Sequence, residues 1–244
     1  MVRRLLVRGM VAGFLASLLA FGFARVVGEP QVARAIAVEE QAAHEMGGSH
    51  AHEVPELVSR EVQSGAGLFV GVAVFGSALG GLFALVFAYV YGRIGRLDAR
   101  ATSVLLSLLG YVAIVVVPFL KYPPNPPAVG DPSTIGLRTA LFFTMIAVSL
   151  VAMTVAVVAA RRLLARADAW TTWLGASAAF VVLAGLAHAW LPGIDEVPNG
   201  FPATLLWQYR VATFGIQAVL WGGLGLIFAR LAQPLMAGRV APAR

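Results

Sequence analysis

The sequence predicts an all-α integral membrane protein, a polytopic bundle of six transmembrane helices. Of its residues, 59% are hydrophobic and only 12% are charged, whereas roughly a quarter of the residues in a soluble domain are charged. The charged residues are clustered, and the uncharged runs between the clusters span residues 62–92, 101–120, 139–160 and 211–229. Each run is long enough, because a helix needs about 20 mainly apolar residues to cross a hydrocarbon layer of ~30 Å. This pattern excludes a water-soluble enzyme.

Two further spans complete the single transmembrane domain that we expect over residues 1–244. The fifth span is apolar apart from His188, and the first is apolar apart from Arg8 and Arg25 near its ends, where arginines can extend to the interface. The first span also resembles a signal peptide, but its apolar run exceeds the roughly 7 to 15 residues of a signal core, so we expect it to be retained. The six spans are expected at about 5–27, 64–91, 102–120, 138–160, 169–191 and 209–231.

The distribution of arginine predicts that both termini are cytoplasmic. Twelve of the 18 basic residues lie in the two terminal segments and in the second and fourth loops, and such segments stay inside under the positive-inside rule. The other three loops hold 10 of the 12 acids. We therefore expect a multi-pass protein of the bacterial cytoplasmic membrane, with the lipid bilayer around it. Arginines beside anionic lipid account for the net charge of +6, so nucleic acid is not an expected partner.

The first outer loop, residues 28–61, is rich in histidine and glutamate. Its early part is compatible with a helix that places Glu40 and His44 on one face. A pair of glycines follows, and then His50, His52 and Glu53. Imidazole and carboxylate ligands suit borderline divalent cations such as cobalt, nickel or zinc. We therefore treat His44, His50, His52 and Glu53 as candidate metal ligands, with a solvated acidic linker that contains incidental histidines as the alternative.

The two other outer loops carry the remaining metal candidates. Residues 121–138 contain five prolines, which predict a stiff, non-helical segment. Residues 191–210 place Asp195 and Glu196 between two prolines, and His188 lies three residues before Leu191, about one helical turn below the outer surface. An ionisable group at that depth usually faces the bundle interior or water. We treat His188, Asp195 and Glu196 as a second candidate metal site, with a hydrogen bond from His188 to a nearby carbonyl as the alternative for that residue.

Two arginines, Arg138 and Arg210, begin the fourth and sixth spans on the outer side, and each follows a loop that contains acids. We expect ion pairs with Asp131, Asp195 or Glu196 that hold the outer mouth together. Partial shielding from water would make such pairs stronger than pairs on an open surface.

Other patterns concern packing and the absence of enzyme motifs. Gly76 and Gly80 form a small-xxx-small pair in the second span, which is typical of close helix packing in membranes. The chain contains no cysteine, so disulfides and thiolate metal sites are excluded. It also contains no Walker A loop, no HExxH helix and no GxSxG elbow. We therefore expect neither enzyme activity nor a permanently bound cofactor.

Three strings of this sequence are similar to the CbtA family of predicted cobalt transporter subunits. They are VFGSALGGLFALVFAYVYGRIGRL, PFLKYPPNPPAVGDPSTIGLRT and LPGIDEVPNGFPATLLWQYRVATFGIQAVLWGGLGLIFA. The likeness extends from about residue 61 to residue 229. It implies a multi-pass membrane protein assigned to cobalt uptake alongside cobalamin synthesis, with a small membrane partner, CbtB, that has a histidine-rich tail. It transfers no ligand set, so the metal ligands named above are inferred from the residues.

The leading hypothesis is a CbtA-like permease subunit that takes up a divalent transition-metal cation, with cobalt as the expected metal. The cation is then the transported ligand, and a CbtB-like protein is the expected partner. The alternative is a non-conducting accessory or sensor protein that binds metal at the outer face and assembles with a partner. A membrane-bound enzyme is disfavoured, because no nucleophile and base stand together in the sequence.

Overall fold

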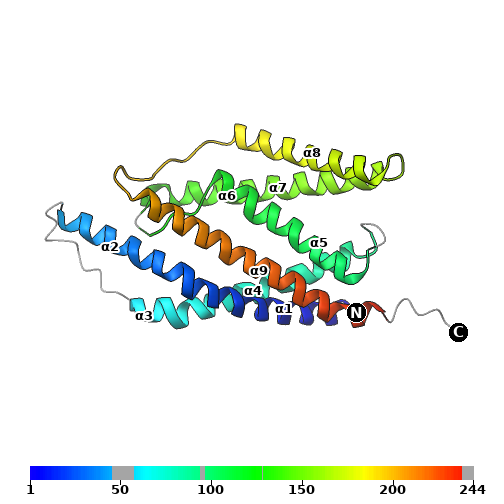
Figure 1. The fold of residues 1–244 in the computed structure, drawn as a ribbon, viewed down its shortest axis with the longest axis horizontal. Helices are drawn as coiled ribbons and strands as arrows, with labels where there is room; N and C mark the ends of the chain where they lie inside the picture. The colour runs from blue at the N-terminus through cyan, green and yellow to red at the C-terminus, as the bar shows by residue number, and fades with distance from the viewer. Residues whose placement is uncertain (46–57, 94–96, 128, 238–244) are drawn as a thin grey trace.

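The computed structural model describes residues 1–45, 58–93, 97–127 and 129–237, and every regular element within these residues is helical. Six helical segments are long and apolar enough to cross a membrane, which confirms the predicted fold class (Figure 1). These segments are Val2–Ala42, Arg60–Val90, Ala99–Lys121, Pro132–Leu163, Ala169–Trp190 and Ala203–Met236.

The first segment extends well past the predicted end of the first span. It consists of α1 (Val2–Phe23), the π-helical turn η1 (Ala24–Gly28) and α2 (Glu29–Glu45). The helix that the sequence indicated for the early part of the 28–61 segment is therefore present as α2, and it continues to Glu45. The reason is local, because residues 31–45 are mostly alanine, valine, glutamate and glutamine with no glycine or proline, and several of these residues favour helix.

Three of the membrane segments contain a π-helical turn near the end that carries the acidic loops. The second segment contains α3 (Arg60–Val62), η2 (Gln63–Gly67) and α4 (Leu68–Val90), and the third contains α5 (Ala99–Tyr111), η3 (Val112–Val116) and α6 (Val117–Lys121). Pro30 and Pro118 each lie two residues after the end of a π turn, η1 and η3 respectively. A proline cannot donate to the carbonyl four residues earlier, and those carbonyls, of Val26 and Ile114, lie inside the two π turns. The wider turns let both helices continue past a proline.

The remaining elements are the short 3₁₀ helix η4 (Pro132–Thr134), α7 (Ile135–Leu163), α8 (Ala169–Trp190) and α9 (Ala203–Ala237). The start of α1, the last turns of α9, the end of α4 with the start of α5, and the α7–α8 connection lie at one end of the molecule, which we call the arginine end (Figure 1). The loops 122–131 and 191–202, with the outer part of α2, lie at the opposite end, which we call the acidic end.

The two acids at the arginine end have a structural role. Asp98 is the N-cap of α5 and accepts a hydrogen bond of 2.8 Å from the N–H of Ala101. Asp168 is the N-cap of α8 and accepts hydrogen bonds from the N–H and the hydroxyl of Thr171, at 3.0 and 2.6 Å. These bonds lower the pKa of Asp168. Each carboxylate satisfies a backbone donor that a helix start leaves open.

The helices form two groups that meet near the acidic end. Helix α1 packs against α4 and α9, and α9 also packs against α5. Helices α7 and α8 form a hairpin, and α7 contacts the first group mainly through η3 and α6. The core of the first group is aromatic, because the ring of Phe228 lies 5.0 Å from that of Phe87 and 5.3 Å from that of Phe83. The position of the hairpin therefore depends on contacts at one end.

Hydrogen bonds inside the bilayer region join α5 to α9. The hydroxyl of Ser103 donates to the carbonyl of Gly225 at 2.8 Å, and that of Ser107 donates to the carbonyl of Trp221 at 2.5 Å. All four residues lie on uncharged spans, and both serines are buried. Such bonds stabilise helix pairs in a membrane, where no water competes for the donors.

Gly76 and Gly80 allow α1 and α4 to approach at backbone distance. A Cβ atom on Gly80 would lie 2.1 Å from the carbonyl oxygen of Gly9, and one on Gly76 would lie 2.8 Å from that of Gly13. The reverse also holds, because a Cβ on Gly13 would lie 2.0 Å from the Gly76 oxygen. The two glycine pairs therefore form one antiparallel contact, and the predicted packing role of Gly76 and Gly80 matches this position.

Replacing Gly80 by alanine is expected to destabilise the α1–α4 contact. The added methyl would meet backbone rather than a flexible side chain, and overpacking of this kind costs about 1–3 kcal/mol. The thermal unfolding midpoint in lipid nanodiscs would measure the effect. Gly71→Ala on the same helix is the matched control, because nothing lies within 4 Å of its Cβ position. Equal stability of the two variants would contradict the proposed close contact.

Candidate functional site

A cleft of about 380 Å³ opens at the acidic end, where the loops after α6 and α8 meet the first turns of α7 and α9. Its volume lies within the range of small-molecule binding sites. The lining residues include aromatic, amide and charged side chains, namely Tyr122, Pro123, Pro124, Asn125, Ile135, Arg138, Thr139, Phe142, Ile194, Asp195, Glu196, Val197 and Arg210. The cleft thus brings together two arginines and two acids from three segments of the chain, α7, α9 and the loop after α8.

Two hydrogen bonds join the loop after α6 to the end of α8. The Lys121 Nζ donates to the carbonyl of His188 at 2.8 Å, and the Tyr122 hydroxyl donates to the carbonyl of Pro192 at 2.8 Å. Burial raises the pKa of the Tyr122 phenol, so this group remains protonated and able to donate. These bonds hold one wall of the cleft in place.

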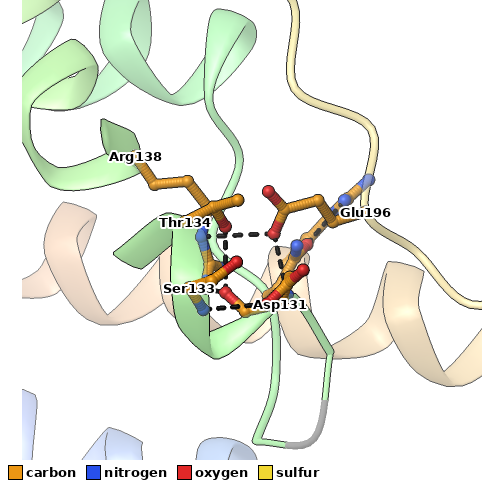
Figure 2. Close-up of polar contacts among 7 residues, drawn as sticks. Asp131, Ser133, Thr134, Arg138 and Glu196 are labelled. Carbon is orange, nitrogen blue, oxygen red and sulfur yellow. Dashed lines mark hydrogen bonds and ion pairs between the residues drawn. The ribbon is translucent and has the colours of Figure 1, made fainter. Parts of the chain in front are cut away.

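Glu196 joins the same two loops at a third point. One of its oxygens, Oε2, accepts a hydrogen bond of 3.0 Å from the N–H of Asp131 and lies 3.3 Å from the Nε of Arg138. Figure 2 shows the Glu196 side chain directed toward the turn that contains Asp131, Ser133 and Thr134. We call this set of contacts the Glu196 clamp. It ties the loop before α9 to the start of α7.

The clamp lowers the pKa of both acids in it. For Glu196, the Thr134 side chain contributes most, followed by the N–H of Asp131 and the positive charge of Arg138, while partial desolvation opposes them. For Asp131, the N–H and side chain of Ser133 contribute most, and the charge of Arg138 adds to them. Both carboxylates are therefore ionised at neutral pH and are already occupied by hydrogen bonds.

Gly130 shapes the position of the Arg138 guanidinium. This glycine has a φ of +122°, which other residues rarely adopt, and a Cβ on it would lie 2.3 Å from an Arg138 Nη. The other end nitrogen, Nη2, donates to the carbonyl of Asp131 at 3.1 Å. Arg138 is thus packed between a glycine and the clamp, as a structural cation of the mouth.

Asp131 and Arg210 do not form the ion pairs that the sequence suggested. The Asp131 carboxylate caps η4 by accepting the N–H of Ser133 at 2.8 Å, so its contacts with Arg138 and Glu196 use its backbone. Arg210 donates from Nη2 to the Asn125 side-chain oxygen at 2.9 Å and from Nε to the Pro124 carbonyl at 3.4 Å. Within the described residues, Arg138 and Glu196 are the ion pair of the mouth.

His188 lies apart from Asp195 and Glu196, with which the sequence grouped it. It does not line the cleft. Its Nδ1 lies 2.9 Å from the carbonyl of Ala184, and because a carbonyl can only accept, Nδ1 carries the proton. In the neutral ring Nε2 then has a free lone pair. This atom is buried and has no hydrogen-bond partner among the described residues.

The predicted capture residues are only partly visible. His44 is exposed near the end of α2, and Glu40 on the preceding turn is exposed as well. His50, His52 and Glu53 lie outside the described residues. Within the described part of the chain, no three histidine or acidic side chains come together as a metal-binding group.

Sequence reasoning missed Asn125, Thr134 and Tyr122 as members of the site. Asn125 accepts a hydrogen bond from Arg210 on α9, and Tyr122 donates one to the carbonyl of Pro192. The Thr134 side chain lowers the pKa of Glu196. The available signal was the proline-rich segment itself, because a stiff loop can hold a polar side chain in a fixed position. Which side chain of this segment contacts which partner does not follow from the residue order.

Six membrane-crossing helices and a polar cleft at one end define a multi-pass membrane protein with a candidate site for a small ligand. The chain belongs to the CbtA family, because residues 2–233 match a family model described as probable cobalt transporter subunit. This match supports transport as the general function, and the word subunit implies a partner or complex. No curated protein and no solved structure matches the chain.

Glu196→Gln is expected to lower the thermal stability of the protein at neutral pH by a few degrees, because it removes the charge from the clamp. The folded-state pKa of Glu196 lies below its ordinary value, which is about 4.3. The stabilisation that the ionised Glu196 carboxylate gives to the folded protein is therefore complete at a pH above that ordinary value. It is lost as the pH falls through the lowered folded-state pKa.

The unfolding midpoints of the parent and Glu196→Gln, measured from pH 7 downward, should therefore converge in acid. Glu39→Gln on the exposed face of α2 controls for the loss of a negative charge at the same end. A gap that stays constant as the pH falls would contradict the clamp.

Proposed function

We propose that the chain is the permease subunit of a cobalt uptake system in the bacterial cytoplasmic membrane. The arginine end faces the cytoplasm, and the cleft at the acidic end opens to the outside. The observation that carries the proposal is the joint occurrence of the CbtA family match and a fixed polar cleft at the end where the acids and histidines are concentrated.

Charge placement supports this direction of uptake. The arginine end carries basic side chains on four segments, while its two acids, Asp98 and Asp168, are helix caps. The acidic end carries Glu40 and His44 on α2 and Asp195 in the cleft. A cation is therefore attracted to the acidic end and repelled from the arginine end. Salt limits the reach of the exposed groups to a Debye length of about 8 Å.

The division of the helices into two groups supports a conducting role over a purely accessory one. Transporters that alternate their access move one group of helices against another around a site near the interface. Here the α7–α8 hairpin and the α1–α4–α5–α9 group meet mainly near the cleft. A movement of the hairpin would therefore change the path between the cleft and the opposite end. His188, on α8, would move with the hairpin.

The partner in this proposal is a small membrane protein of the CbtB type with a histidine-rich segment. Such a segment would deliver cobalt to the acidic end, where His44, His50, His52 and Glu53 form the proposed capture region. His188 and Asp195 are the proposed ligands along the path. No residue of the chain binds a permanent cofactor in this proposal, because the metal is the cargo.

Purified protein in liposomes should accumulate radioactive Co²⁺ above the level of protein-free liposomes. The assay is run with and without a CbtB-like partner, since the partner is expected to increase the rate at limiting metal. Metal binding without accumulation under both conditions would contradict the permease role and support a non-conducting accessory.

Two histidine variants should separate capture from passage. His44→Ala is expected to raise the cobalt concentration for half-maximal uptake and to leave the maximal rate unchanged, because His44 is exposed outside the bundle. His188→Ala is expected to lower the maximal rate several-fold, because the buried Nε2 of His188, which has no hydrogen-bond partner among the described residues, is the proposed ligand along the path. An unchanged maximal rate for His188→Ala would remove this residue from the proposed path.

A further inference from the structure

The two guanidinium groups of the cleft have different surroundings. Arg138 faces a carboxylate, that of Glu196, and also donates to the carbonyl of Asp131. Arg210 contacts only uncharged oxygens in the described structure, those of Asn125 and Pro124. The positive charge of Arg138 is therefore neutralised by a direct partner, whereas that of Arg210 is not.

Arg210 is nevertheless held firmly enough to act as a binding group. Its Nε and Nη2 are each directed to a fixed acceptor on the proline-rich loop, and a guanidinium has five N–H donors. The donors that remain are available at a cleft that Arg210 itself lines. A planar guanidinium with free donors is well suited to a carboxylate, which it can bind through two parallel hydrogen bonds.

Asp195 adds a negative group to the same cleft. It lines the cleft and is exposed, and its charge acts on Arg210 without forming an ion pair with it among the described contacts. The cleft therefore presents one cation and one anion that line the same cavity but are not bonded to each other. A ligand that carries a negative and a positive centre side by side would satisfy both.

A bare divalent cation fits this arrangement poorly. Glu196 is occupied by the N–H of Asp131 and by Arg138, which leaves Asp195 as the one lining acid outside the clamp. The guanidinium of Arg210, which lines the same cleft as Asp195, repels a cation. If the metal arrives with carboxylate groups bound to it, these groups supply most of its oxygen ligands and reverse the sign of the complex.

We propose that the cleft receives the divalent cation as a small anionic carboxylate chelate, with Arg210 binding a carboxylate of the chelate and Asp195 facing the metal. This inference rests on the proposed function and specifies the form of its substrate. Asn125 and Pro124 position the guanidinium, and the Glu196 clamp fixes the opposite wall. No covalent step is involved, because the chelate binds as a preformed complex.

Cobalt(II) citrate is the probe for this inference, and two measurements are made with it. Equilibrium dialysis of radioactive cobalt against purified protein in nanodiscs measures binding. Accumulation by proteoliposomes measures transport. In both, total cobalt is held constant while citrate is raised until nearly all cobalt is chelated, so that a site for the free ion loses its ligand and a site for the chelate gains one.

The parent protein is expected to retain or increase binding and accumulation in excess citrate. Arg210→Gln should weaken chelate binding by about tenfold or more, as expected for the loss of a charge-assisted hydrogen bond, and Arg210→Lys should lie between the two. Arg34→Gln is the matched control, because Arg34 is at the same end and contacts Gln208 outside the cleft. Size-exclusion profiles confirm that each variant is folded.

Each outcome separates the two proposals. Parallel loss of binding and accumulation in excess citrate, with Arg210→Gln equal to the parent, would overturn the chelate inference and leave cobalt transport standing. Chelate binding that depends on Arg210 without any accumulation would support the inference about the cleft and contradict the permease role. Binding of citrate alone as strongly as cobalt citrate would show that the site recognises a carboxylate without metal, and would also overturn the inference.

Discussion

The Glu196 clamp is the contact on which the geometry of the acidic end depends. One carboxylate oxygen accepts the N–H of Asp131 and lies beside the Arg138 guanidinium, so a single side chain joins the loop before α9 to the start of α7. The hairpin of α7 and α8 meets the other helices mainly near this end. The loops therefore do more than connect spans, because together with Lys121 and Tyr122 they determine where the hairpin sits. Without these loop contacts, the positions of Arg210 and Asp195 relative to each other in the cleft would not be fixed.

The helical framework could be predicted from the sequence, whereas the contacts in the loops could not. Uncharged runs of about 20 residues have one stable form in a bilayer, so the six spans follow from composition alone. The spacing of Gly76 and Gly80 likewise indicated a close helix contact, although not that Gly9 and Gly13 are the partners. The helix of the first span continues through η1 and α2 to Glu45, and the sequence indicated this extension only by the helical face that Glu40 and His44 share.

Opposite charges in neighbouring loops predicted ion pairs at the outer mouth, and only one of these pairs is present in the described residues. Glu196 lies beside Arg138, but Asp131 uses its carboxylate to cap η4, and Arg210 turns to Asn125 and Pro124. Backbone N–H and carbonyl groups compete with side-chain charges for these contacts, and their positions depend on turns such as that at Gly130. The choice between a charged and an uncharged partner therefore required the three-dimensional arrangement. Instead of the expected set of ion pairs, the cleft contains one arginine that pairs with a carboxylate, Arg138, and one that does not, Arg210.

The most direct test of the account is the side of the membrane to which the cleft opens. The chain has no cysteine, so Val197→Cys in the cleft wall and Leu164→Cys at the arginine end each introduce a single thiol. With a membrane-impermeant maleimide added to intact cells, we expect labelling of Val197→Cys and no labelling of Leu164→Cys until the membrane is permeabilised. Labelling of Leu164→Cys from outside, with Val197→Cys protected until permeabilisation, would contradict the account.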